Sequence, residues 1–161
     1  MDIEQALIHE PISSLPLKQP ITLPLDAALS DAVETLQRNN IGCVLVLDAS
    51  GGLAGIFTER DLLTRVVGKV EGWERQPLAA FMTPGPETLR PEDPIAWALN
   101  YMHQGGYRHV PLLDEMGRLA GVVSVKDIVD NVVDVFPAKV LNLPPRPVRV
   151  PLAYGEIGGD A

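Results

Sequence analysis

The sequence Gly51-Gly-Leu-Ala-Gly-Ile-Phe-Thr-Glu-Arg-Asp61 returns 66 positions later as Gly117-Arg-Leu-Ala-Gly-Val-Val-Ser-Val-Lys-Asp127. Extending outward from this stretch, residues 22–63 align with residues 88–129 without a gap, and 11 of these 42 positions are identical. Self-similarity at one fixed offset is the signature of a repeated structural unit. The chain therefore contains two copies of one unit.

Each copy has the pattern of a β-α-β-β-α unit, which makes this an α/β (α+β) protein. Apolar residues at i, i+3, i+4 and i+7 predict an amphipathic helix in each copy. They are Leu29, Ala32, Val33 and Leu36 in the first copy, and Ile95, Ala98, Leu99 and Met102 in the second. Gly42 and Gly105-Gly106 stand where we expect these helices to stop.

A hairpin and a second helix complete the unit. Short extended entries at 22–23 and 88–89 come before the first helix, and strand-length runs at 44–48 and 110–114 follow it. The return strands span 53–58 and 119–124. The last helix carries Leu62, Leu63, Val66 and Val67 in one copy, and Ile128, Val129, Val132 and Val133 in the other. One unit is too small to bury its apolar surface well, so we expect the two copies to pack together.

The repeat divides the chain into five segments. They are an N-terminal leader (1–12), the first repeat (13–68), a linker (69–81), the second repeat (82–136) and a proline-rich arm (137–161). Proline density excludes a long helix from the last segment. It is either an extended arm or partly disordered, and its apolar residues favour the arm. We expect Trp97 to pack between the repeats and Trp73 to anchor the linker.

Composition excludes several classes of partner and site. The formal net charge of −8 argues against nucleic acid and against an anionic membrane surface. No apolar run approaches the length of a membrane-spanning helix, and the N-terminus has no signal-peptide pattern, so we expect a soluble cytoplasmic protein. The single cysteine, Cys43, cannot form an internal disulfide, and its apolar surroundings predict a buried hydrophobe.

The strongest local motif has two readings. Thr58-Glu-Arg-Asp61 and Ser124-Val-Lys-Asp127 each stand where a strand ends and a helix begins. The pattern [ST]-x-x-[DE] is a capping box, in which hydroxyl and carboxylate satisfy free N–H groups. The same geometry suits a nucleotide, because a helix N-terminus favours phosphate and a carboxylate accepts from both ribose hydroxyls. The residues alone leave both readings open.

A family resemblance favours the second reading. The segment Tyr107-Arg-His-Val-Pro-Leu-Leu-Asp114, followed by 117–127, resembles the cystathionine-β-synthase (CBS) domain, and so does the stretch 41–61. Met82-Thr-Pro-Gly-Pro86 is similar to the start of second CBS copies. The resemblance covers about residues 13–135. It implies a tandem CBS-domain pair, or Bateman module, with pseudo-twofold symmetry, up to two clefts for AMP, ADP, ATP or related adenosyl ligands, and dimerisation.

The resemblance also implies roles for particular residues. Asp61 and Asp127 match ribose-binding aspartates, and Thr58 and Ser124 match hydroxyls on the phosphate side. Each cleft borrows residues from the other copy. The Asp127 cleft is expected to include Ile21, Ile41 and Gly42, and the Asp61 cleft Thr83, Glu87, Tyr107 and Arg108.

The two copies differ at the positions that would meet phosphate. Arg108 and His109 match a basic pair that contacts phosphates, whereas the first copy has Gly42 and Cys43 there. We therefore expect lopsided phosphate contacts, with one cleft weak or empty.

Two functional classes follow from the sequence. The first is a non-catalytic sensor that takes an adenine nucleotide as a regulatory ligand, requires no cofactor, forms a homodimer and acts on an unidentified effector protein. The alternative is a structural protein–protein interaction module whose clefts are vestigial. No catalytic triad, carboxylate dyad or Gly-rich phosphate loop is visible, so we predict no enzyme activity. The spacing of His103 and His109 fits no standard metal pattern, and we predict no metal site.

Overall fold

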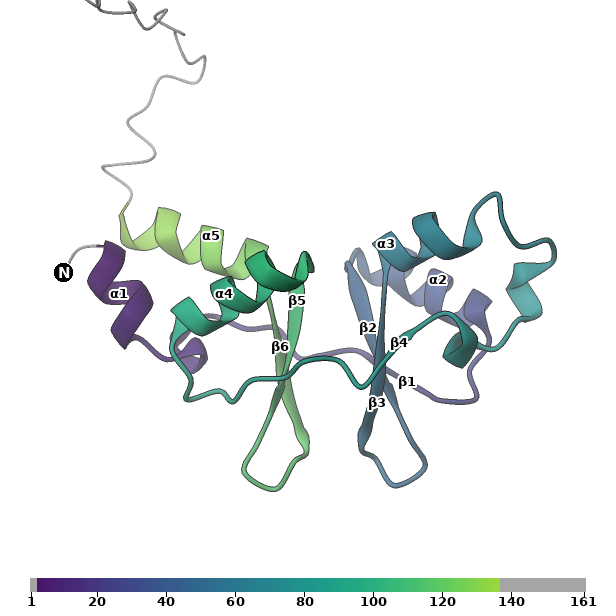
Figure 1. The fold of residues 1–161 in the computed structure, drawn as a ribbon, viewed down its shortest axis with the longest axis horizontal. Helices are drawn as coiled ribbons and strands as arrows, with labels where there is room; N and C mark the ends of the chain where they lie inside the picture. Colours follow the sequence, from purple (N-terminus) through teal and green to yellow (C-terminus); the bar gives the residue numbers. More distant parts are fainter. Residues whose placement is uncertain (1–2, 137–161) are drawn as a thin grey trace, which may run out of the picture.

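The computed structural model describes residues 3–136, which form two similar halves lying side by side (Figure 1). In each half a β-hairpin extends away from a layer of helices. In chain order the elements are α1 (Ile3–His9), the 3-10 turn η1 (Ile12–Ser14), β1 (Thr22–Pro24), α2 (Leu29–Asn39), β2 (Cys43–Leu47), β3 (Leu53–Thr58), α3 (Glu59–Asp61), the π-helical turn η2 (Leu62–Val66), the 3-10 turns η3 (Trp73–Arg75) and η4 (Leu78–Ala80), β4 (Thr83–Pro84), α4 (Ile95–Gly105), β5 (His109–Leu113), β6 (Leu119–Ser124) and α5 (Val125–Val135).

The strands confirm two β-α-β-β-α units. In the first half β1 pairs in parallel with β2, and β2 pairs antiparallel with β3. In the second half Leu89 forms a parallel bridge to Leu112, and β5 pairs antiparallel with β6. The chain entering the second repeat also adds β4 to the edge of β3. This pairing ties the start of one repeat to the sheet of the other.

Side chains alternate along the strands and so build separate cores. On β2, Val44 and Val46 point into the core of the first half with Phe57, and all three are fully buried. Cys43 and Leu45 point the other way and pack with Ile56. Leu119 and Val122 of the second half join this last cluster, so it is a seam between the repeats. Because successive side chains of a strand point to opposite faces, β2 packs one apolar face against the core of its own repeat and the other against the second repeat.

The two first helices end differently, and one expectation about them is wrong. Helix α4 ends as predicted, at Gly106 in the left-handed conformation with φ of 69°. Helix α2 ends at Asn40, which takes the left-handed conformation with φ of 50°, and not at Gly42. Asparagine tolerates this conformation because its short polar side chain can bond locally. Gly42 is therefore free for another role, which lies in the site described below.

The last helix of the first half is irregular where the sequence predicts a regular one. After α3 the chain makes the π-helical turn η2, in which the Val67 N–H donates to the Leu62 carbonyl at 3.0 Å. The Thr64 hydroxyl donates to the Arg60 carbonyl at 2.7 Å, and such back-bonding competes with the regular ladder. Helix α5 is regular over the equivalent residues.

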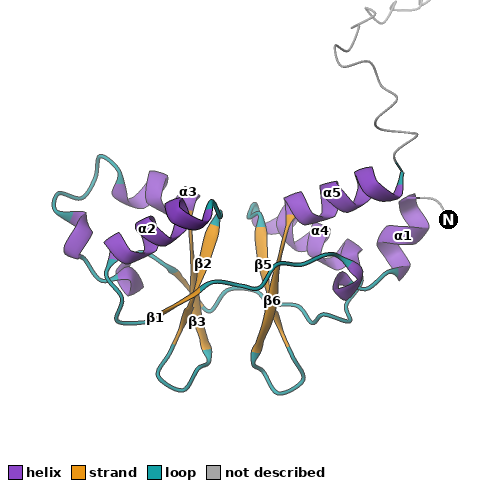
Figure 2. Cartoon of the chain, turned by 180° about the vertical axis from the view of Figure 1, so that it is seen from behind, coloured by secondary structure: helices purple, strands orange, loops and turns teal. Residues whose placement is uncertain are grey.

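The structure of the leader and the positions of the two tryptophans correct one expectation. The leader forms α1, which packs against α4 of the second half (Figure 2). Trp97 does not lie between the repeats, since its side chain is exposed on α4. Trp73 packs against the core of the first half, as expected for a linker anchor, and Cys43 is buried.

The predicted arm over 137–161 lies outside the described residues. Between residues 3 and 136 no helix is both long and apolar enough to cross a membrane.

Candidate functional site

Two cavities lie where the halves meet, and each takes residues from both repeats. The first, which we name the Asp127 cleft, has a volume of about 370 Å³. The second, the Asp61 cleft, has a volume of about 610 Å³. Both volumes fall in the range typical of small-molecule sites. The pseudo-symmetric hairpins β2–β3 and β5–β6 approach each other here, so each cleft pairs one repeat's helix start with the other repeat's entry segment.

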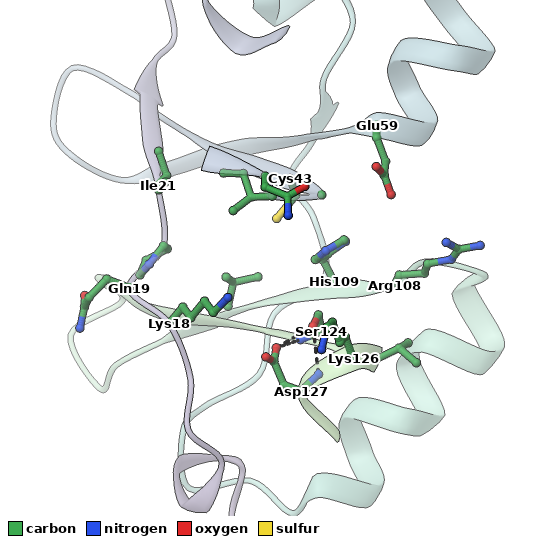
Figure 3. A pocket seen from close by; sticks show the side chains of 16 residues that line it. Lys18, Gln19, Ile21, Cys43, Glu59, Arg108, His109, Ser124, Lys126 and Asp127 are labelled. Carbon is green, nitrogen blue, oxygen red and sulfur yellow. Dashed lines mark hydrogen bonds between the residues drawn. The ribbon is translucent and has the colours of Figure 1, made fainter. Parts of the chain in front are cut away.

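The floor of the Asp127 cleft is the junction between β6 and α5 (Figure 3). Oδ2 of Asp127 accepts from the backbone N–H of Ser124 at 2.7 Å and from its hydroxyl at 2.6 Å. Oγ of Ser124 in turn accepts from the Asp127 N–H at 3.2 Å. Within residues 3–136, Oδ1 of Asp127 accepts no hydrogen bond from another side chain. One carboxylate oxygen is therefore available to a ligand.

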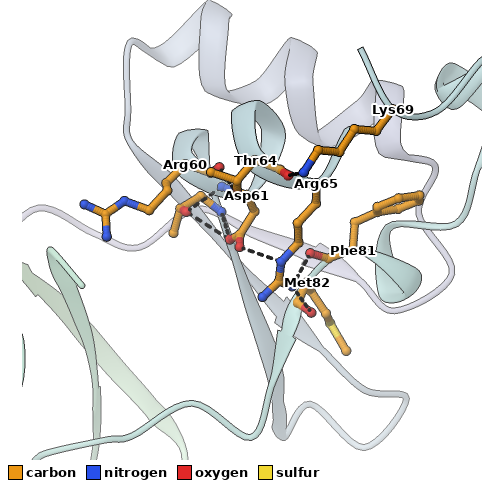
Figure 4. Close-up of polar contacts among 8 residues, drawn as sticks. Arg60, Asp61, Thr64, Arg65, Lys69, Phe81 and Met82 are labelled. Atoms are coloured by element: carbon orange, nitrogen blue, oxygen red, sulfur yellow. Dashed lines mark hydrogen bonds and ion pairs between the residues drawn. The ribbon is translucent and has the colours of Figure 1, made fainter. Parts of the chain in front are cut away.

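The Asp61 cleft repeats this junction with an additional cation. Oδ2 of Asp61 accepts from the N–H and the hydroxyl of Thr58, both at 2.9 Å. Oδ1 lies 3.4 Å from Nε of Arg65, as Figure 4 shows. Arg65 also donates to the carbonyls of Phe81 at 3.0 Å and Met82 at 3.2 Å. In this cleft the second carboxylate oxygen already has a charged partner.

The capping reading is thus correct as a description of the unliganded protein. Both motifs form complete capping boxes, at Thr58 and at Ser124. A capping box and a ligand site are compatible, because a carboxylate has about four acceptor positions and the box uses two. The geometry neither requires a ligand nor prevents one.

The predicted residues all line one or both of these cavities. Ile21, Ile41 and Gly42 line the Asp127 cleft with Ser124 and Asp127. The Asp61 cleft is lined by the other predicted set, which comprises Thr58, Asp61, Thr83, Glu87 and Tyr107. Arg108 and His109 line both clefts, although the sequence places Arg108 in the Asp61 cleft alone.

Several lining residues were not found from the sequence. Lys18, Glu59 and Lys126 line the Asp127 cleft, and Arg60 and Arg65 line the Asp61 cleft. The two capping-box motifs contain Glu59, Arg60 and Lys126, so the motifs could have indicated these three residues as cleft residues. Lys18 lies outside the aligned residues 22–63, so the comparison of the two repeats could not indicate it.

Glycines shape the walls of both clefts. A Cβ at Gly42 would lie 2.9 Å from Cε1 of His109, so the missing side chain makes room for the imidazole. A Cβ at Gly105 would lie 1.9 Å from the ring of Tyr107, which lines the Asp61 cleft. Each glycine therefore allows a ring from the second repeat to sit against the backbone.

Burial decides the ionisation of the clefts' titratable groups. Burial lowers the pKa of His109 below its ordinary value, although the carboxylates of Glu59 and Asp127 partly oppose this. The imidazole is therefore neutral at pH 7. Burial, together with Asp127, raises the pKa of Cys43 to about 12, so this thiol is not a nucleophile. Burial and the nearby Glu87 raise the pKa of Tyr107. No cluster of three or more His, Cys, Asp or Glu suited to a metal ion occurs within residues 3–136.

Comparison with known proteins gives relatives of the same architecture. A 17.7 kDa protein from Acidianus ambivalens is 26% identical over 110 residues, which are 68% of this chain and 65% of that protein. A CBS domain-containing protein from Arabidopsis thaliana is 28% identical over 103 residues, which are 64% of this chain but 19% of that protein. The matched region therefore spans about two thirds of the Acidianus protein and about a fifth of the Arabidopsis protein.

Solved structures resemble the fold over most of the described chain. A CBS-domain containing protein from Agrobacterium tumefaciens is 34% identical with a TM-score of 0.65, covering 70% of this chain and 84% of that one. A CBS domain protein from Pyrobaculum aerophilum, complexed with AMP, is 23% identical with a TM-score of 0.68, covering 78% and 99%. A further CBS domain pair, complexed with 5-methylthioadenosine and S-adenosyl-L-methionine, is 23% identical with a TM-score of 0.67, covering 76% and 98%.

The family model described as CBS domain matches this chain twice, over residues 12–68 and over residues 78–134. These ranges contain both hairpins and both capping-box motifs. The protein therefore belongs to the CBS-domain family and carries two CBS domains in tandem.

Proposed function

We propose that this protein is a non-catalytic regulatory module that binds an adenosine-type nucleotide, such as AMP, ADP or ATP, in the Asp127 and Asp61 clefts. One observation carries the proposal. Each cleft places a hydroxyl and a carboxylate at a helix start, opposite apolar or aromatic side chains from the other repeat and beside the shared cation Arg108. A nucleoside phosphate needs these three kinds of contact together.

In the Asp127 cleft each part of the ligand has a matching group. Oδ1 of Asp127 is open to ribose hydroxyls, and a charge-assisted hydrogen bond is about twice as strong as a neutral one. Ile21, Ile41 and Val122 offer apolar surface to a purine. The N-terminus of α5 and the cations Lys126 and Arg108 favour phosphate.

In the Asp61 cleft the ligand would compete with an internal partner. Arg65 lies beside the carboxylate oxygen that a ribose would use, so binding here requires Arg65 to share or release it. Tyr107 supplies an aromatic face that the other cleft does not have. The proteins of similar fold that were solved with AMP, or with methylthioadenosine and S-adenosylmethionine, support an adenosyl ligand for such a module.

The alternative function is a structural interaction module with vestigial clefts. The complete capping boxes favour it, because they explain both aspartates without any ligand. The two functions do not differ in assembly, since a homodimer fits either one. They differ in whether a nucleotide stabilises the protein.

A thermal-shift experiment with two asparagine variants separates these functions. AMP, ADP and ATP are each added to the wild-type protein and to Asp61→Asn and Asp127→Asn. The asparagine oxygen can still accept within the cap, so the unliganded variants should melt close to the wild type. Their stabilisation by saturating nucleotide should shrink, because a ligand that binds only the native state raises stability by RT ln(1 + [L]/Kd).

Alanine variants provide the matched control. Thr58→Ala and Ser124→Ala should each destabilise the unliganded protein by about 0.5–2 kcal/mol, the usual loss for a cap. If no nucleotide shifts the melting of the wild type, or if both asparagine variants keep its full shift, the motifs are only caps and the structural module is the correct function.

A further inference from the structure

The two clefts share one wall. Four residues line both cavities, namely Gly42, Glu59, Arg108 and His109. Figure 3 shows His109 near the middle of the Asp127 cleft, with Arg108 to its right and Glu59 above it on the facing repeat. A side chain of this wall can therefore contact a ligand in either cleft.

The wall's cationic groups come from the second repeat alone. At the equivalent positions of the first repeat stand Gly42 and Cys43, one without a side chain and the other buried. The backbone is nevertheless symmetric here, because the Glu59 N–H donates to the Gly42 carbonyl at 3.1 Å and the Val125 N–H to the Arg108 carbonyl at 3.0 Å. The backbone of the wall is therefore symmetric, whereas its basic side chains come from the second repeat alone. As a result the single guanidinium of Arg108 lines both cavities.

The wall also contains an anion on one side only. Glu59 corresponds to Val125 in the second repeat. Its Oε1 would lie 3.7 Å from a Cβ at Gly42, close to the imidazole of His109. The imidazole is buried, so it does not add a second full positive charge at neutral pH. Arg108 is thus the one permanent positive charge of the shared wall.

From this geometry we propose that the two clefts are negatively coupled for phosphate-bearing ligands, because both draw on Arg108. The proposal rests on the nucleotide-binding function proposed above. A guanidinium directed at a phosphate in one cleft is withdrawn from the other, and like charges on both sides of the shared wall repel where they lie within the screening length of about 8 Å at physiological salt. Bare adenosine carries no phosphate and should show no coupling.

The size of the effect should follow the number of phosphates. Coupling between ligand sites usually changes affinity by about 5- to 150-fold. We expect ATP in one cleft to weaken ATP binding in the other at least about fivefold, AMP to do so less, and adenosine not at all. By reciprocity the effect is the same whichever cleft is filled first.

Calorimetric titration of the full chain tests the coupling. Asp61→Asn and Asp127→Asn each weaken one cleft, so titrating ATP and adenosine into these variants gives the affinity of the remaining cleft alone. The two single-cleft affinities predict the wild-type titration if the clefts are independent. We expect the wild type to bind the second ATP at least about fivefold more weakly than that prediction, or to bind a single ATP. Adenosine should follow the independent prediction.

A second pair of variants assigns the coupling to Arg108. Arg108→Gln should reduce the difference between ATP and adenosine, whereas Arg118→Gln should leave it unchanged. Arg118 pairs with Asp114 near the β5–β6 turn and lines neither cleft, so it matches the charge change without touching the wall.

The outcomes separate the two proposals. If both clefts bind and the wild-type ATP titration equals the independent prediction, the nucleotide-binding function stands and the coupling is overturned. The coupling is also overturned if one variant binds no ligand, since a second site is then missing, or if Arg108→Gln leaves it intact. If neither the wild type nor any variant binds a nucleotide, both proposals fail.

Discussion

Asp61 and Asp127 occupy equivalent positions yet have different surroundings. Each closes a capping box through Oδ2, but Oδ1 faces Arg65 in one case and is open in the other. Position 131, the counterpart of Arg65, is Asn131. Equivalent motifs therefore leave one carboxylate oxygen open at Asp127 and pair the corresponding oxygen of Asp61 with an arginine.

Gly42 offers a direct test of the shared wall. Replacing it with alanine would place a Cβ 2.9 Å from Cε1 and 3.0 Å from Nε2 of His109, so the imidazole must move. We expect Gly42→Ala to raise the pKa of His109 toward about 6.5, because a displaced ring regains water. Proton NMR of the imidazole measures this. Gly121→Ala is the control, since its Cβ would meet Leu112 at 3.5 Å and Leu17 at 3.9 Å, both ordinary contacts. An unshifted His109 pKa in Gly42→Ala would contradict the packing.

His109 should also make stability depend on pH. Burial lowers its folded-state pKa below the unfolded value of about 6.5, so the unfolded chain binds the proton more readily. The stabilisation is fully present above about pH 6.5 and is lost as pH falls through the folded-state pKa. Urea unfolding at pH 7.5 and at pH 5 should therefore show a larger loss in the wild type than in His109→Gln. Equal losses would mean that the ring titrates as if it were in water.

At the scale of elements, the regular pieces followed from the sequence and the irregular ones did not. Both hairpins and both amphipathic helices were predicted from periodicity, since burial on one face imposes that period. The π-helical turn η2 was not predicted, because it depends on tertiary hydrogen bonds. Arg65, within that turn, reaches the carbonyls of Phe81 and Met82 at the far end of the linker. Helix α1 was not predicted from the sequence, because it is stabilised by packing against α4.

Arg65 should act as a brace for the first repeat. In Arg65→Gln the shorter side chain loses the hydrogen bonds to the carbonyls of Phe81 and Met82, which should cost about 1–3 kcal/mol of unfolding free energy, since each net hydrogen bond contributes about 0.5–1.5 kcal/mol. Arg38→Gln is the control, because Arg38 forms only an exposed ion pair with Glu34 and should change stability by less than about 0.5 kcal/mol. Urea denaturation compares the two variants. Equal stability would show that the contacts to the linker contribute nothing.

At the scale of the whole molecule, exposed apolar side chains predict a symmetric homodimer. Leu63 and Val67 on one repeat, and Val129 and Val135 on the other, are each about half exposed or more, from 48% to 67%. They belong to helices on the same side of the molecule, away from the hairpin turns. An isologous pair of copies is the commonest way to cover such a face.

Light scattering at micromolar concentration tests this assembly. We expect twice the chain mass for the wild type and the chain mass for the double variant Leu63→Glu, Val129→Glu, because buried unpaired carboxylates oppose pairing. Met116→Glu should stay dimeric, since Met116 is 77% exposed but lies in the β5–β6 turn. A monomer mass for the wild type at every concentration would overturn the dimer.

The residues of each cleft were largely predictable from the sequence, but the wall that the two clefts share was not. Repeat symmetry and family resemblance placed Ile21 and Ile41 opposite Asp127, and Glu87 and Tyr107 opposite Asp61. They did not indicate that Arg108 and His109 reach both clefts, because a sequence offset gives equivalent positions and no distances across the pseudo-twofold axis. Gly42 was placed in the Asp127 cleft, but its close approach to the His109 ring, 67 residues away, was missed for the same reason.

The structure of the protein crystallised with AMP tests nucleotide binding most directly. AMP should occupy at least one cleft, with ribose hydroxyls within hydrogen-bond distance of the Asp127 or Asp61 carboxylate and the phosphate near Arg108 and the adjoining helix start. The capping hydrogen bonds to Ser124 and Thr58 should persist in that complex. Empty clefts at saturating AMP, or AMP bound away from both aspartates, would contradict the proposed function.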